Sequence, residues 1–256
     1  MKKWILCLLA FVLLFSNANA SQKLVVGVNP TYAPFEYMEN ETLQGISIDF
    51  LQAYAIQANM EIEFKKLSWE GLLPALQTGQ VDMVISSLAI TDKRKVAVDF
   101  SRPYAQSDIA ILSSNEFESL QALQETKINI AVILSSSTQD KAQLLFPKAT
   151  IAHYSNVEEA VQAVVNRSVD ALLYDAYPVL DAQQQWQDST HAFVLHEQVE
   201  QWGIAFPKGS AHIAPINAFI ENFHKQGGFA LLTEKYKEQG AYSLTEEELL
   251  QFFAVQ

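Results

Sequence analysis

The chain has 256 residues, of which 49% are hydrophobic and 18% are charged, and its formal net charge is −12. This length and composition are typical of a soluble globular protein with one large domain or two lobes of about 100 residues each. The excess of acidic residues makes nucleic acid and anionic membrane surfaces poor partners, so we expect the protein to bind neither.

The first twenty residues predict a cleaved secretory signal. Lys2 and Lys3 precede the apolar run WILCLLAFVLLF, and a small-residue site, SNANA, ends at Ala20. The run is too short to anchor the chain in a bilayer, and Cys7 lies inside it rather than at the cleavage site, so we expect neither a membrane helix nor a lipid anchor. The mature chain would have no cysteine and a net charge of −14, since two lysines are lost. We expect a free, monomeric protein in a bacterial periplasm.

From residue 24 the chain alternates short β-branched runs with helical patterns. Strands are predicted at LVVGV (24–28), EIEFKKL (61–67) and DMVIS (82–86), and helices at IDFLQAYAIQA (48–58) and WEGLLPALQTG (69–79). The same order returns after a break near residues 113–125, with strands at INIAVI (128–133), TIAHY (150–154) and DALLY (170–174). Alternating strands and helices predict parallel sheets covered by helices on both faces.

A further helix is indicated by Asn156 and Glu159, a helix-start pair ahead of VEEAVQAVVN. Two stretches, LQTGQVDMVISS (76–87) and VVNRSVDALLYD (164–175), then share one plan: a helix end, a Val-Asp pair, an apolar strand and polar side chains. We therefore predict an α/β fold of two similar lobes.

The limits that we predict are residues 22–107 with 202–256 for lobe one and 108–201 for lobe two. Two crossings between lobes make a hinge that ligand binding can close. In open parallel sheets, ligands bind beyond the carboxyl ends of the strands. The polar segments at those ends are 29–35, 86–94, 134–139 and Asp175. We predict a ligand cleft where these segments face each other.

Motifs for nucleotide binding and covalent catalysis are absent from the sequence. It has no G-x-S-x-G elbow, no G-x-x-x-x-G-K-[ST] loop and no G-x-G-x-x-G turn. The five histidines show no metal-binding spacing, and the carboxylates are mostly unclustered, as on a solvated surface. We expect no cofactor and no metal.

Arg94 follows a predicted buried strand, although the chain is acidic overall. Its guanidinium could bind a carboxylate through two parallel hydrogen bonds, and the hydroxyls of Ser86 and Ser87 could complete an anion site. Asp175 would supply the opposite charge from the other lobe. Each residue alone is more often a surface residue than a ligand, but together they favour a site for a zwitterion.

Two aromatic side chains are candidates for the walls of the cleft. Tyr32 lies in NPTYAPFEY and Trp69 in LSWEGLL, both in predicted loops. Their rings could sandwich a ligand side chain by cation–π attraction or by apolar contact. Spacing alone equally allows Trp69 to be a core residue at the start of a helix.

Four segments carry a family resemblance: VGVNPTYAPFEY, GISIDF, LLPALQTGQVDMVISSLAITDKRKVAVDFSRPY and GIAFPKG. They resemble the family 3 extracellular solute-binding proteins, the polar amino-acid-binding components of ABC importers. The resemblance covers Lys23 to Tyr242 and is most specific over residues 72–104. It implies a two-lobed type II periplasmic-binding-protein fold, each lobe a mostly parallel sheet flanked by helices, with the ligand between the lobes and a membrane permease as partner.

The resemblance also implies roles for individual residues. Arg94 would grip the α-carboxylate of an amino acid, and Asp175 would take its α-ammonium. The other positions that match the family's substrate contacts are Tyr32, Trp69, Ser86, Ser87 and Thr138. Asn29 and Gln139 are added as candidates because they lie in the polar segments at the strand ends.

Three positions depart from the family pattern. Ala89 stands where relatives often have a polar residue or glycine, and Ser136 stands where the turn of the second lobe usually has glycine. Asn29 replaces an aspartate that some relatives with cationic ligands have. The tail at residues 243–256 extends past the family's usual end and predicts an acidic amphipathic helix, which we expect to pack on lobe one.

The sequence therefore predicts a periplasmic protein that captures a free polar amino acid and delivers it to an ABC permease. The predicted sandwich favours a cationic ligand such as arginine or lysine first, and the amide of Asn29 suits glutamine second. One alternative is an enzyme on the same scaffold, similar to cyclohexadienyl dehydratases. Such an enzyme needs a general acid in the cleft, where Glu36 is the only spare carboxylate that we expect. Another alternative is an amino-acid-sensing module that reports to a receptor.

Overall fold

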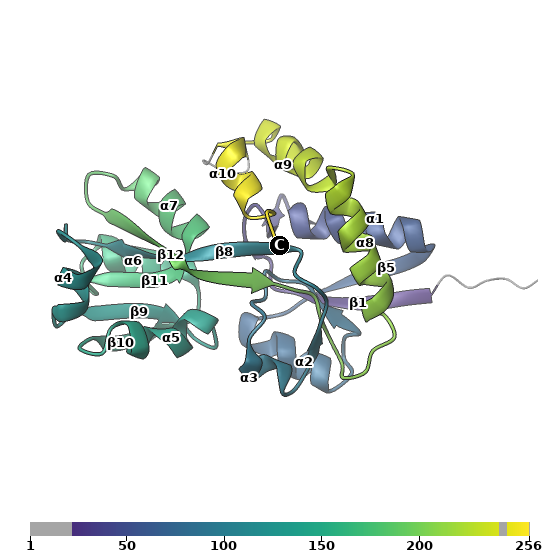
Figure 1. The fold of residues 1–256 in the computed structure, drawn as a ribbon, viewed down its shortest axis with the longest axis horizontal. Coiled ribbons are helices and arrows are strands. Elements are labelled where there is room, and N and C mark those ends of the chain that lie inside the picture. The colour runs from purple at the N-terminus through teal and green to yellow at the C-terminus, as the bar shows by residue number, and fades with distance from the viewer. Residues whose placement is uncertain (1–21, 241–244, 256) are drawn as a thin grey trace, which may run out of the picture.

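The computed structural model describes residues 22–240 and 245–255, so the predicted signal at residues 1–20 lies outside the described residues. The described chain forms two α/β lobes side by side, each built on a five-stranded sheet (Figure 1). This arrangement confirms the predicted fold class. In the part of the chain that is described, no helix has the length and apolar character needed to cross a membrane.

The first sheet has the strand order β5-β1-β6-β13-β7. Its strands are β1 (Gln22–Val28), β5 (Met60–Lys66), β6 (Met83–Val84), β7 (Asp99–Phe100) and β13 (Ala205–Phe206). β1 pairs in parallel with β5 and β6, as the alternation of strands and helices predicts, whereas β13 runs antiparallel to both of its neighbours. The sheet is therefore mixed, and its parallel half comes from the N-terminal βαβ units.

Helices cover both faces of the first sheet (Figure 1). One face carries α1 (Ile46–Ala58), α8 (Ile213–Lys225) and α9 (Gly228–Glu238), and the other carries the 3-10 helix η1 (Trp69–Gly71), α2 (Leu72–Gln77) and α3 (Asp92–Lys95). Neighbouring residues of a strand point to opposite faces of the sheet. Val26 and its partner Met83 therefore pack in the core under α1, whereas Val84, next to Met83, packs in the core with α2. The predicted helix at 48–58 is confirmed, and the one at 69–79 is divided into η1 and α2.

The second sheet has the strand order β10-β9-β11-β8-β12. Its strands are β8 (Ala105–Ser113), β9 (Asn129–Ile133), β10 (Thr150–Tyr154), β11 (Ala171–Asp175) and β12 (His191–Trp202). β9 is parallel to β10 and β11, and β8 is antiparallel to β11 and β12. α6 (Val157–Val165) and α7 (Ala176–Gln185) pack on one face, and α4 (Leu120–Glu125) and α5 (Ser137–Leu145) pack on the other.

The two Val-Asp pairs make the same hydrogen bonds in both lobes. The carboxylate of Asp82 accepts from Val25 N at 2.8 Å, and Asp82 N donates to Val25 O at 2.7 Å. Asp170 makes the matching bonds to Asn129 at 2.7 and 2.9 Å. Each aspartate fixes the start of a central strand against its parallel neighbour. The carboxyl ends of these strands therefore lie at one edge of each sheet, which confirms the predicted similarity of the two halves.

The polar segment after β1 folds into a small antiparallel sheet. Its strands are β2 (Thr31–Tyr32), β3 (Glu36–Glu39) and β4 (Thr42–Gln44). Tyr32 pairs directly with Glu36, so both side chains point to the same face of this hairpin. Gly45, at φ +134°, makes the turn into α1, where a Cβ would collide with the Phe35 carbonyl. This turn fixes the hairpin at the inner edge of lobe one.

Strands β8 and β12 carry the chain between the lobes (Figure 1). They pair with each other along most of their length, with a register shift between Leu195 and Val199. At the first lobe, Tyr104 N donates to Trp202 O at 2.9 Å. The positions of these strands support the lobe limits at 107/108 and 201/202, which we retain as a proposal.

The C-terminal tail forms the short helix α10 (Glu246–Gln251), as predicted. Thr245 begins it with a capping box, and Leu249, Phe252 and Phe253 are buried in the core of lobe one. Gln106, in β8, donates from its backbone N to Phe252 O at 2.6 Å and from Nε2 to Ala254 O at 3.2 Å. The tail therefore packs on lobe one and on a strand that joins the lobes.

Candidate ligand-binding site

A cavity lies between the lobes at the carboxyl ends of β1, β6, β9 and β11, where the sequence predicts a ligand cleft. It is lined by seven of the predicted contact residues: Asn29, Tyr32, Trp69, Ser86, Ser87, Arg94 and Asp175. Their contacts with a ligand stay predictions. Within residues 22–240 and 245–255, no group of His, Cys, Asp and Glu side chains is arranged to hold a metal ion.

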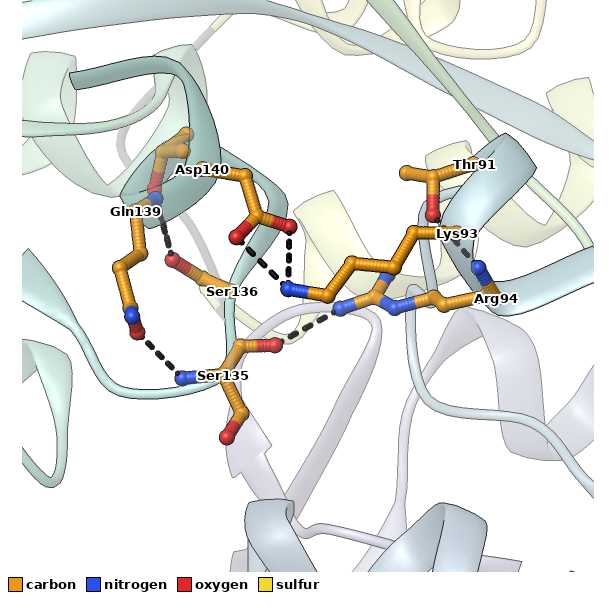
Figure 2. Close-up of polar contacts among 8 residues, drawn as sticks. Thr91, Lys93, Arg94, Ser135, Ser136, Gln139 and Asp140 are labelled. Atoms are coloured by element: carbon orange, nitrogen blue, oxygen red, sulfur yellow. Dashed lines mark hydrogen bonds and ion pairs between the residues drawn. The ribbon is translucent and has the colours of Figure 1, made fainter. Parts of the chain in front are cut away.

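The Arg94 guanidinium is held by backbone groups of both lobes, and Figure 2 shows its bond to Ser135 of lobe two. α3 begins after Thr91, whose Oγ1 accepts a hydrogen bond from Arg94 N at 3.2 Å. The buried guanidinium donates from Nη1 to Ala89 O at 2.8 Å and from Nη2 to Ser135 O at 3.0 Å. These bonds use two of the five N–H donors of a guanidinium, so a carboxylate can meet the others. Burial lowers the pKa of Arg94, and the charge of Glu200 opposes that shift.

The two aromatic candidates have different surroundings. Trp69 opens η1 rather than lying in a loop, and the guanidinium carbon of Arg94 is 5.5 Å from its ring centre, in a cation–π contact. Tyr32 lies in β2 and is buried. Its ring packs against those of Phe35, Tyr174, Tyr177 and Trp202. Trp69 thus orients the cation of the site, whereas Tyr32 is held by an aromatic cluster.

Asp175 is the last residue of β11 and is buried at the cavity. The hydroxyl of Tyr32 donates to its Oδ2 at 3.2 Å across the cleft. Burial and the nearby charge of Glu200 raise the pKa of Asp175, and the hydrogen bond from Tyr32 partly opposes this shift. An ammonium group beside Asp175 would favour the ionised carboxylate, so the residue is suited to a cationic partner.

Asn29 and Ser86 join the ends of β1 and β6. Ser86 Oγ accepts a hydrogen bond from Asn29 N at 3.0 Å. The amide of Asn29 donates from Nδ2 to Leu67 O at 3.0 Å and accepts from Thr31 Oγ1 at 2.6 Å. Both ends of this amide are therefore engaged by the protein. Ser87 follows at φ +44°, and its buried Oγ has no hydrogen-bond partner among the described residues.

The turn after β9 presents other residues to the cavity than those predicted. Ser136 caps α5, and its Oγ accepts from Gln139 N at 3.0 Å and lies 2.9 Å from Thr138 Oγ1. Gln139 Oε1 accepts from Ser135 N at 2.7 Å (Figure 2). Ser136 and Ser137 line the cavity, whereas Thr138 and Gln139 are not among its described lining residues. Thr138 and Gln139 shape the turn that carries the two serines, and their contacts with a ligand stay predictions.

A charged pair joins the lobes beside the site (Figure 2). Lys93 Nζ lies 2.8 and 3.0 Å from the two carboxylate oxygens of Asp140, so α3 of lobe one meets α5 of lobe two. Both side chains are exposed, at 75% and 44%. Together with the bonds of Arg94 and Tyr32 to the second lobe, this pair shows that the lobes touch across the cleft.

The cavity has one more carboxylate than the sequence analysis expects. Glu36 lines it as expected, and so does Glu200, near the end of β12. Glu200 is buried, accepts a hydrogen bond from Ser137 Oγ and forms an ion pair with Lys141 at 2.9 Å. The expectation that Glu36 is the only spare carboxylate is therefore wrong. The available signal was the position of Glu200 in EQWGIAF, just before the chain re-enters the first sheet.

Residues 24–239 match the sequence profile of the bacterial extracellular solute-binding proteins, family 3. The chain belongs to this family. The arginine-binding extracellular protein ArtP of Bacillus subtilis is 28% identical over 252 residues, which are 92% of this chain and 98% of ArtP. The arginine-, lysine-, histidine-binding protein ArtJ of Geobacillus stearothermophilus is 29% identical, with a TM-score of 0.76 over 84% of this chain and 95% of ArtJ.

A third similar structure is the ancestral amino acid-binding protein AncCDT-1, described as a precursor of cyclohexadienyl dehydratase. It is 31% identical, with a TM-score of 0.73 over 84% of this chain and 94% of that chain. These likenesses and the two observed lobes give this family 3 member the type II periplasmic-binding-protein fold. Membership also places the protein among extracellular solute-binding proteins, with its cavity in the cleft between the lobes.

Proposed function

We propose that this family 3 protein, as a periplasmic monomer, captures a free polar amino acid and delivers it to an ABC-type permease. The observation that carries the proposal is that Arg94 and Asp175, buried groups of opposite charge from different lobes, line one cavity. Arg94 would bind the α-carboxylate, and Asp175 would bind the α-ammonium beside the Tyr32 hydroxyl. Because a zwitterion satisfies both lobes at once, it binds the closed form better than the open form and favours closure.

The ligand that we propose is a cationic amino acid such as arginine or lysine first, and glutamine second. ArtP is named for arginine, and ArtJ for arginine, lysine and histidine. Besides Arg94, the cavity is lined by the carboxyl groups of Glu36, Asp175 and Glu200. These groups favour a ligand with a positive side chain over one with a negative side chain. The rings of Tyr32 and Trp69 add flat surfaces that suit a guanidinium.

Binding rather than catalysis is the function that we propose. An enzyme would need a general acid in the cleft, and Glu36 and Glu200 are carboxyl groups that line it. Glu200, however, is already engaged by Lys141 and Ser137. The family is one of solute-binding proteins, and AncCDT-1 is itself named as an amino acid-binding protein. Permease and ATPase genes beside this gene would support delivery to an importer, whereas signalling genes alone would support sensing.

A thermal-shift screen of the twenty amino acids on refolded, ligand-free protein tests the proposal. A ligand at about 100 times its Kd adds about 2.7 kcal/mol to the free energy of unfolding, so it raises the melting temperature. We expect the largest shifts with arginine, lysine or glutamine. A response only to aspartate, glutamate or small apolar amino acids would contradict the ligand class. No response to any amino acid would contradict amino-acid binding.

A further inference from the structure

Glu36 is a buried carboxyl group without a hydrogen-bond partner, and it lines the ligand cavity. It is the first residue of β3, has no exposed surface, and neither of its oxygens has a partner among the described residues. Ser87 Oγ, on the same cavity, is likewise buried and without a partner among these residues. Buried polar groups are nearly always hydrogen-bonded, so this pair is incomplete as it stands.

The protein's own groups do not supply a counter-charge to Glu36. The titratable groups that face it from the neighbouring elements are Tyr32, Tyr104, Tyr174 and Asp175. Burial raises the pKa values of all three tyrosines, so these groups stay neutral near pH 7. Asp175 adds a negative charge when it is ionised. Burial raises the pKa of Glu36 to about 8, and the nearby hydroxyls of Ser87 and Ser47 partly oppose this shift without reaching hydrogen-bond geometry.

The position of Glu36 complements that of the proposed α-ammonium site. Tyr32 pairs directly with Glu36 in the small sheet and donates its hydroxyl to Asp175. Glu36 therefore lies beside Tyr32, on the wall that lobe one contributes to the cavity. Asn29 stands where some relatives have an aspartate for a cationic ligand. Here both ends of its amide are engaged within the protein, by Leu67 and Thr31.

We propose that Glu36, with the Ser87 hydroxyl beside it, is a third anchoring point of the cleft and accepts hydrogen bonds from the cationic end of the ligand's side chain. This inference rests on the proposed function, in which Arg94 and Asp175 hold the α-carboxylate and α-ammonium. An ammonium or guanidinium group supplies both the charge and the donors that Glu36 lacks. Glu36 thereby selects a cationic side chain over a neutral one of similar length.

Proton release distinguishes this subsite from the rest of the cleft. Burial raises the pKa of Glu36 to about 8, which favours the protonated carboxyl group at neutral pH in the cleft as the structure shows it. A cationic side chain favours the ionised carboxylate, so its binding expels that proton. Arginine and glutamine both present an α-ammonium to Asp175, and only arginine presents a cation to Glu36. Arginine should therefore release more protons than glutamine.

Isothermal titration calorimetry with arginine and glutamine tests the subsite in the parent, Glu36→Gln and Glu63→Gln proteins. Glu36→Gln keeps the size of the side chain and should lower arginine affinity about tenfold or more, with a much smaller change for glutamine. Glu63, an exposed residue of β5 paired with Lys23, is the matched control, because its variant loses the same charge outside the cavity. Equal changes for both ligands in Glu36→Gln, or no change for arginine, would overturn the subsite while leaving amino-acid binding intact.

The same titration in two buffers of different ionisation enthalpy needs no variant. At pH 7 the parent should release up to about one proton more with arginine than with glutamine. Equal proton release by the two ligands would overturn the subsite even if Glu36→Gln failed to fold. A parent protein that bound none of arginine, lysine and glutamine would overturn the proposed ligand class and this inference together.

Discussion

Arg94 and Asp175 show how single residues can be positioned for a ligand by contacts that do not neutralise them. Arg94 is buried, but its guanidinium donates to two carbonyl oxygens and lies over the Trp69 ring. Asp175 is buried with the Tyr32 hydroxyl as its partner, and its pKa is raised. Both side chains are fixed in direction, and each would be stabilised by the opposite charge of a zwitterion.

We expect Arg94→Ala to abolish amino-acid binding, with little change in the melting temperature of the ligand-free protein. Leaving a ligand carboxylate unpaired in a buried site should cost about 3–5 kcal/mol, which is more than a hundredfold in Kd. Calorimetry measures the loss. Arg102→Ala is the matched control, since Arg102 pairs with Glu221 on the surface of lobe one. Binding by Arg94→Ala within a few-fold of the parent would show that Arg94 does not hold the carboxylate.

Asp175→Asn should weaken binding strongly, and the loss should depend on the α-ammonium of the ligand. Arginine and 5-guanidinopentanoate, which lacks the α-amino group, separate the two effects in a titration. The parent should bind the second compound poorly, and the variant should lose much less affinity for it than for arginine. If both compounds lost affinity equally, Asp175 would serve the packing of the lobes.

Ligands bind beyond the carboxyl ends of parallel strands, and this rule predicts most of the residues at the cavity. The rule needs only the order of strands and helices, which the sequence shows locally. It places Asn29, Ser86, Arg94 and Asp175 at the cavity. It misses Glu200, because the rule concerns the segments that follow parallel strands, and Glu200 lies within β12, which pairs antiparallel with β8. Thr138, which the family resemblance adds, is not among the described lining residues; its Oγ1 lies 2.9 Å from the Ser136 Oγ that caps α5, and its contact with a ligand stays a prediction.

At the level of elements, the βαβ segments are predictable and the strands that join the lobes are not. β1, β5, β9 and β10 lie where the sequence predicts strands. β1 pairs with β5 and β9 with β10, as the local alternation of strands and helices predicts. β8 and β12 pair across about ninety intervening residues, for example Ser107 with Glu200. No local pattern reports such a contact. The helix pair α3 and α5 meets for the same non-local reason, through Lys93 and Asp140.

We expect Lys93→Ala to raise the ligand dissociation rate by up to about fivefold, because exposed ion pairs contribute about 0.2–1 kcal/mol. The pair forms only when the lobes touch, so its loss should act on opening rather than on the binding chemistry. Stopped-flow displacement measures the rate. Lys95→Ala is the control from the same helix, since Lys95 pairs with Asp92 of α3 itself. Equal rates for the two variants would mean that the pair does not restrain the lobes.

For the whole molecule, closing the cleft brings acidic groups together in a buried place. Asp175 and Glu36 line the cavity with raised pKa values, and burial is the larger cause for each. The folded protein therefore binds protons that the unfolded chain releases. The strands that join the lobes and the tail packed on Gln106 hold this arrangement without any disulfide among the described residues, which include no cysteine.

The free energy of unfolding of the ligand-free protein should fall as the pH rises from about 5 to 8. The pKa of Glu36 is about 8 in the folded protein against 4.5 ordinarily, so folding takes up a proton between these values and loses that stabilisation as the pH rises through them. At about 1.4 kcal/mol per pKa unit, the loss is a few kcal/mol. Urea denaturation at several pH values should show a flatter profile for Glu36→Gln than for Glu63→Gln. Identical profiles would mean that Glu36 is ionised in the folded protein.

The contact between Trp69 and Arg94 has an optical consequence. The emission of an indole changes with the charge and water around it, and here a guanidinium lies 5.5 Å from the ring centre at the cavity wall. A ligand carboxylate that engages Arg94 neutralises the charge over that ring. Trp186 is partly exposed and outside the described cavity lining, so its emission should stay constant. Tryptophan fluorescence should therefore follow occupancy of the cleft without any added dye, and Trp69→Phe should remove most of the change, leaving what Trp202 contributes through its contact with Tyr32.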